Sequence, residues 1–110
     1  MNLEERMHEL RDLAKKAATA RAEREYLEEF KKSKLAILMK EAEQKGFATA
    51  AAQEREARAD KDYELFLSGL RVAVELSEQL EWELRIAMKG ADLWQTSQMV
   101  EMSERKAYRA

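Results

Sequence analysis

The stretch that decides the fold is residues 63–98, YELFLSGLRVAVELSEQLEWELRIAMKGADLWQTSQ, because one apolar stripe runs through it. Steps of three and four residues alternate along the stripe, which is the heptad spacing of packed α-helices. Its members are Tyr63, Phe66, Leu70, Ala73, Ser77, Leu80, Leu84, Ala87, Ala91, Trp94 and Gln98. The pattern predicts a long helix over about residues 61–104.

Two glycines lie inside this predicted helix, and each costs up to about 1 kcal/mol relative to Ala. Because Gly69 and Gly90 have no side chain, another helix could approach the α-helical backbone closely at these two positions. Gly90 leaves open a second interpretation, in which one helix ends there and another begins. The basic tail at residues 105–109, RKAYR, is expected to be disordered.

The first half of the chain predicts another long helix, over residues 3–45. Its early seam has the same alternating spacing, and farther along a broad apolar face replaces it. The seam consists of Leu3, Met7, Leu10, Ala14 and Ala17, and the broad face of Tyr26, Leu27, Phe30, Ile37 and Leu38. Gly46 fits the position that ends a helix in the left-handed conformation.

A short helix is predicted between the two long ones, over residues 48–59. This stretch is rich in Ala and then charged, with no Pro or Gly inside it. Thr49 is placed to cap its start, and Asp60 or Asp62 to cap the start of the last helix.

Composition supports an all-α fold. The 110 residues include no Pro, three Gly and one Asn, too few turn formers for a sheet protein of this size. The sequence therefore predicts one helical domain over residues 1–110, a long helical hairpin with a short intervening helix. Apolar surface beyond what one hairpin can cover predicts assembly into an oligomeric helix bundle. That surface comprises Leu27, Phe30, Trp82, Ile86, Leu93, Trp94 and Val100.

Charge and cysteine content narrow the functional classes. The formal net charge is −2, which disfavours a nucleic-acid clamp formed by the whole protein, and the absence of Cys excludes disulfides and zinc–thiolate sites. The N-terminus has no apolar signal region, and no apolar run reaches about 18–20 residues. We expect a cytoplasmic protein without a membrane span.

Residues that could carry catalysis or bind a metal are few. Glu5 and His8 have the Glu-x-x-His spacing of carboxylate metal sites, but those sites need two such motifs and this chain has one His. The five Ser residues all fall on predicted helices, and no glycine-rich phosphate loop occurs. The sequence therefore predicts no enzyme, no cofactor and no metal site.

Two sets of residues are candidates for binding surfaces. Aromatic residues off or beside the stripes predict protein contacts at Trp82, Trp94, Tyr26 and Phe30. A basic set could contact phosphates around the same rings, although glutamates are interleaved with it. This set consists of Arg21, Arg24, Lys31, Lys32 and Lys34.

Several segments resemble small uncharacterised phage and prophage proteins. They are residues 23–40, EREYLEEFKKSKLAILMK, residues 49–60, TAAAQEREARAD, and the later Trp82-Glu83-Leu84 and Leu93-Trp94-Gln95-Thr96. Relatives often have Arg where this chain has Gln95, which weakens the argument for DNA contact there. The resemblance implies an early-region phage protein encoded near single-strand-annealing recombinases, in the host cell cytoplasm.

Three functions remain open at this stage. The leading hypothesis is a homo-oligomeric interaction protein that assists phage DNA recombination or replication by contacting a recombinase or a host nuclease. The alternatives are a module that binds single-stranded or duplex DNA directly through the basic set, and a coiled-coil protein of the virion.

Overall fold

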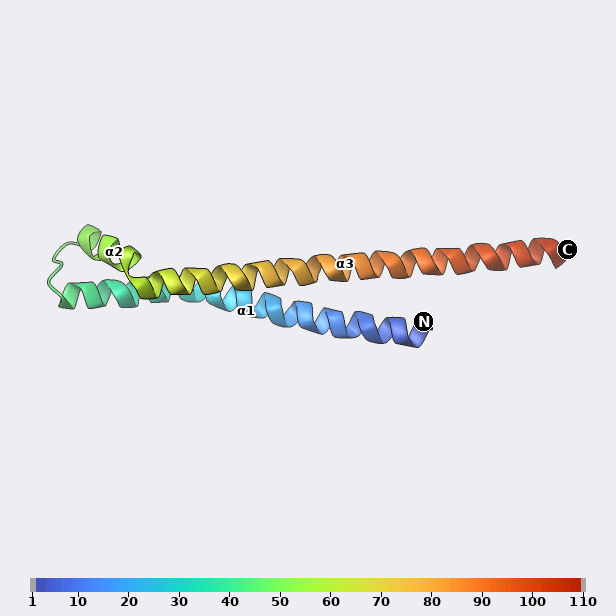
Figure 1. Ribbon diagram of the computed structural model, residues 1–110, viewed down its shortest axis with the longest axis horizontal. Helices are drawn as coiled ribbons and strands as arrows, with labels where there is room; N and C mark the ends of the chain where they lie inside the picture. The colour runs from blue at the N-terminus through green and yellow to red at the C-terminus, as the bar shows by residue number, and fades with distance from the viewer. Residues whose placement is uncertain (1, 110) are drawn as a thin grey trace. The chain divides into compact units, whose positions relative to one another are not determined.

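The computed structural model describes residues 2–109, which form three helices. The long helix α1 spans Leu3–Gln44, the short helix α2 spans Ala50–Ala59, and the long helix α3 spans Lys61–Arg109 (Figure 1). No strand occurs in this part of the chain. The predicted all-helical architecture of a long, a short and a second long helix is therefore confirmed.

The chain divides into two compact units. The turn unit is Thr19–Glu78, and the terminal unit combines Met1–Ala18 with Gln79–Ala110. Both long helices run continuously from one unit into the other, whereas α2 belongs entirely to the turn unit. The turn unit therefore has three helical elements and the terminal unit has two.

The end of α1 is a glycine-dependent stop, as predicted. Gly46 has a φ of +106°, in the left-handed region. The Phe47 N–H donates to the Ala42 carbonyl at 3.2 Å, and the Gly46 N–H donates to the Glu43 carbonyl at 3.0 Å. This pair of bonds is the Schellman arrangement, which satisfies carbonyls that the helix end leaves free.

Side-chain caps fix both ends of the short connection. Thr49 Oγ1 accepts a hydrogen bond from the Ala52 N–H at 3.2 Å, which confirms the predicted cap of α2. Asp60 Oδ1 accepts a hydrogen bond from the Asp62 N–H at 2.8 Å. This bond caps the start of α3, which follows α2 directly. Gln53 Nε2 also donates to the Phe47 carbonyl at 2.9 Å, which ties α2 to the preceding loop.

The core of the turn unit joins all three of its helices. Leu38 from α1, Ala57 from α2 and Tyr63 from α3 form one buried cluster. Partly buried apolar side chains surround it, namely Leu35, Met39 and Leu67. The short helix thus covers an apolar end that two helices would leave open.

The predicted α3 stripe is the inner face of that helix. From Tyr63 to Trp94 every member is buried or half-buried, and only Gln98 is exposed. In the terminal unit, however, no described stripe residue of α3 is fully buried. Two helices alone do not enclose their own seam there.

The predicted seam at the start of α1 was partly wrong. Leu3, Met7 and Ala14 are exposed, and the inward positions are Arg6, Leu10, Leu13 and Ala17. Tyr26 and Ile37, placed on the broad face, are exposed as well. The inward positions keep the same spacing in a different phase, because Arg6 and Arg24 occupy seam positions that an apolar pattern cannot reveal.

Two further details of α3 test the sequence predictions, and only the second differs from them. The helix passes through Gly90 without a break, so the one-helix interpretation holds. The basic tail is helical as far as Arg109 and not disordered. The positive charges of Lys106 and Arg109 lie in the last turn, where they interact favourably with the negative end of the helix dipole. None of the described helices contains a segment apolar and long enough to cross a lipid bilayer.

Candidate functional site

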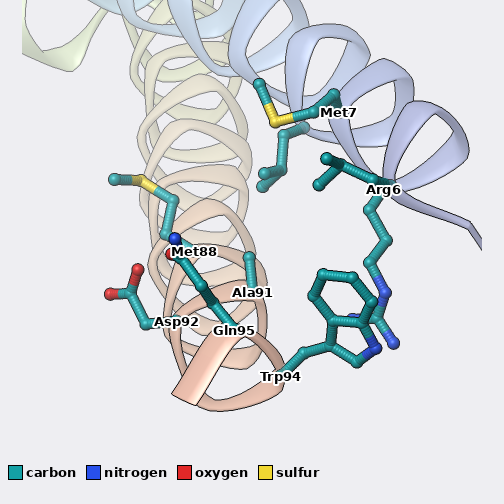
Figure 2. Close-up of a pocket in the computed structure, with 9 residues that line it drawn as sticks. Arg6, Met7, Met88, Ala91, Asp92, Trp94 and Gln95 are labelled. Atoms are coloured by element: carbon teal, nitrogen blue, oxygen red, sulfur yellow. The ribbon is translucent and has the colours of Figure 1, made fainter. Parts of the chain in front are cut away.

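An apolar groove lies in the terminal unit between the start of α1 and the middle of α3. Its volume is about 400 Å³. The lining residues are Leu3, Arg6, Met7 and Leu10 from α1, and Met88, Ala91, Asp92, Trp94 and Gln95 from α3. Figure 2 shows Met7, Met88 and Trp94 bordering the same space from the two helices. We call this hollow the terminal groove.

A cation–π contact forms one wall of the terminal groove. The Arg6 guanidinium carbon lies 5.1 Å from the centroid of the Trp94 ring (Figure 2). Arg6 Nε is shielded from solvent and has no hydrogen-bond partner among the described residues. The attraction between the cation and the electron-rich indole face is therefore the contact that holds this side chain.

The other walls consist of flexible apolar side chains that remain open to solvent. Leu3, Met7 and Met88 are all large apolar residues that are exposed to solvent. Methionine has three rotatable bonds and a polarizable sulfur, so a Met-lined surface adapts to differently shaped partners. The groove is thus suited to binding apolar segments of differing shape, because its own side chains can adjust.

The two tryptophans predicted as contacts do not lie together. Trp94 is half-buried in the groove wall, whereas Trp82 is 57% exposed on a separate face of α3. The Arg85 guanidinium carbon lies 5.0 Å from the Trp82 ring centroid. Each indole is paired with an arginine, and sequence patterns did not identify either arginine as its partner.

The other two predicted aromatic contacts lie in the turn unit. Tyr26 is exposed and stacks on Phe30, with ring centroids 6.1 Å apart. Phe30 is half-buried against Phe66, at a centroid distance of 5.8 Å. Phe30 therefore belongs to the packing of α1 on α3, and Tyr26 extends that packing to the surface.

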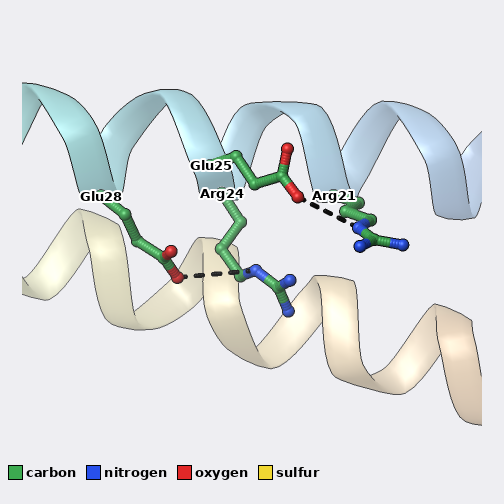
Figure 3. Close-up of polar contacts among 4 residues, drawn as sticks. All are labelled: Arg21, Arg24, Glu25 and Glu28. Atoms are coloured by element: carbon green, nitrogen blue, oxygen red, sulfur yellow. Dashed lines mark hydrogen bonds and ion pairs between the residues drawn. The ribbon is translucent and has the colours of Figure 1, made fainter.

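The predicted nucleic-acid residues are partly neutralised by neighbouring glutamates. Arg21 Nε lies 3.1 Å from Glu25 Oε1, and Arg24 Nε lies 3.5 Å from Glu28 Oε1 (Figure 3). The Arg24 side chain is mostly shielded, and Lys34 is half-buried. Lys31 and Lys32 are exposed but stand beside the interleaved acids. This face has balanced charge and not the basic excess that phosphate binding requires.

The His8 motif has a local explanation. His8 Nε2 lies 3.4 Å from Asp12 Oδ2, one helical turn away, and both side chains are exposed. Across residues 2–109, no three His, Cys, Asp or Glu side chains gather closely enough to hold a metal ion.

Comparisons with protein-family models, with curated proteins and with solved structures each gave no match to this chain.

Proposed function

We propose that this chain is an interaction protein that binds an apolar helical segment of another protein in the terminal groove. The observation that carries the proposal is the groove itself, which exposed Leu3, Met7 and Met88 line together with the half-buried Trp94. A groove between two helices is suited to the apolar face of a third helix. Its action is binding and not catalysis.

The chemistry of the groove describes its partner. An amphipathic helix with apolar residues at positions i, i+3 or i+4, and i+7 would fill the hollow between α1 and α3. The resemblance to phage proteins adds a candidate class, a phage recombinase or a host nuclease in the host cytoplasm. Direct DNA contact is the weaker alternative, because ion pairs occupy Arg21 and Arg24.

Photocrosslinking tests the groove at single-residue resolution. A benzophenone amino acid at Met88 is expected to capture a partner that the same group at Met99 does not. Met99 is also exposed, at 63% against 54% for Met88, but lies outside the groove. Introducing Met7→Glu should remove the adduct, since a carboxylate in the groove opposes apolar binding. Equal capture at both positions, or an adduct that survives Met7→Glu, would contradict the proposal.

A further inference from the structure

Few contacts hold the first part of α1 against α3 in the terminal unit. We call residues 3–16 the N-terminal arm. In the part of the chain that the structure describes, no hydrogen bond or ion pair joins this arm to α3, and His8, for example, pairs with Asp12 one turn along the same helix. The cation–π contact of Arg6 with Trp94 is the electrostatic contact between the arm and α3. The arm is therefore held mainly by apolar packing.

The apolar packing of the N-terminal arm is incomplete. Its inward leucines, Leu10 and Leu13, are half-buried, and no residue of the arm is buried. Burial in α1 begins with Ala17, directly after the arm, and Leu38 farther along is 3% exposed in the three-helix cluster. Since the stabilisation from burial grows with the apolar area removed from water, the arm is held less strongly than the turn unit.

The arm shields the inner face of α3. Leu10 and Ala91 both line the terminal groove, and Leu13 and Ala87 both line a neighbouring hollow between the same helices. When the arm leaves α3, stripe residues at heptad spacing become accessible together. They are Leu84, Ala87, Ala91 and Trp94. The terminal groove is lost in the same step, because arm residues form part of its lining.

We propose that the N-terminal arm opens from α3 as one unit while the turn unit stays folded, and that the Arg6–Trp94 contact is a latch that limits this opening. Local openings of this kind need less free energy than global unfolding and occur where few apolar contacts are buried. The latch sets how often the inner face of α3 is accessible to another helix. The inference goes beyond the proposed groove function, because it concerns the chain without a partner.

Hydrogen exchange of the full chain without a partner, followed residue by residue with NMR, tests the opening. Most helical stability in proteins comes from tertiary packing, so an open arm exchanges its amide protons. The Leu10 and Leu13 amides are expected to have equal protection, at least about 10-fold below that of the Leu38 amide. Urea should accelerate their exchange less steeply than that of Leu38, since opening the arm exposes less surface than global unfolding.

Two matched arginine substitutions test the latch. Arg6→Met keeps an unbranched apolar side chain but removes the cation beside Trp94, and it is expected to speed amide exchange in the arm about fivefold. Arg85→Met removes the cation from Trp82 elsewhere in the same unit and should leave exchange in the arm unchanged. Circular dichroism establishes that both variants keep the helix content of the unaltered chain.

Three results would overturn the proposal. Equal protection and equal urea dependence at Leu13 and Leu38 would mean that the arm and the turn unit unfold together. A steady fall in protection from Leu13 toward Met7 would mean ordinary fraying of a helix end. Equal effects of Arg6→Met and Arg85→Met would mean that the cation–π contact is not a latch. No partner is present in these measurements, so a failure of the groove function and a failure of the opening are distinguishable.

Discussion

The turn unit and the terminal unit use the same two helices, yet they bury their side chains differently. In the turn unit, α2 covers the seam, and Leu38, Ala57 and Tyr63 are all buried. In the terminal unit no third element is present, and Ala17 is the one buried apolar residue among those described there. The difference shows that a two-helix seam becomes a core only when something covers its side.

The exposed apolar residues have the complementary distribution. Most of them lie on α3 in the terminal unit, including Trp82, Ile86 and Leu93. In the turn unit, α2 covers the apolar seam. In the terminal unit, the proposed partner would cover the exposed apolar residues of the terminal groove. The turn unit is thus expected to carry the stability of the chain and the terminal unit its binding surfaces.

The largest expected contrast is between two leucines of α1. Leu38→Ala should lower the free energy of unfolding by about 3 kcal/mol, because it opens a cavity in the buried cluster. Leu13→Ala should lower it by roughly half as much, since Leu13 is only half-buried. Urea denaturation followed by circular dichroism, at one protein concentration, measures both. Equal losses would show that the terminal unit packs as well as the turn unit.

Glycines in the turn unit offer a contrast of opposite sign. Gly46→Ala should destabilise the chain by about 1–2 kcal/mol, because alanine is strained at a φ of +106°. Gly69→Ala should stabilise it by up to about 1 kcal/mol, because a Cβ there meets no atom within 4 Å inside a helix. Thermal unfolding compares the two. A stabilising Gly46→Ala would show that the left-handed stop is not needed.

One polar side chain weakens the turn unit. Ser77 is fully buried, and its Oγ has no hydrogen-bond partner among the described residues. Ser77→Ala should therefore raise the free energy of unfolding by about 1 kcal/mol more than Ser68→Ala, an exposed site with the same change in helix propensity. Chemical denaturation of the two variants gives the difference. No difference would mean that the hydroxyl has a partner in solution.

The sequence predicted the architecture because its strongest signals are local. Each of these signals depends on a few adjacent residues that commonly have one structural role. They are the α3 stripe, the helix stop at Gly46 and the helix caps at Thr49 and Asp60. The α1 seam was set in the wrong phase because two of its positions hold arginines. Apolar patterns count arginine as surface, although its aliphatic stem packs well.

The candidate site was predictable only in part. Trp94 followed from its place on the stripe, but its partner Arg6 lies 88 residues away and on a different helix. Pairing across that distance depends on the register of α1 against α3. A signal was present, because Arg6, Leu10, Leu13, Ala17 and Arg24 follow heptad spacing once arginine is allowed on the seam.

The smallest expected effect compares the two arginine–tryptophan pairs of the terminal unit. Arg6 with Trp94 should show a coupling energy of about 1 kcal/mol, and Arg85 with Trp82 about 0.5 kcal/mol, because a cation–π contact strengthens as it is desolvated. Double-mutant cycles with Arg→Met and Trp→Leu measure both couplings in the free energy of unfolding. Trp82 is exposed, so water competes for its cation, whereas Arg6 Nε is shielded beside Trp94. Equal coupling energies would show that both pairs are in the same solvent environment. The Arg6–Trp94 contact would then not form a desolvated wall of the terminal groove.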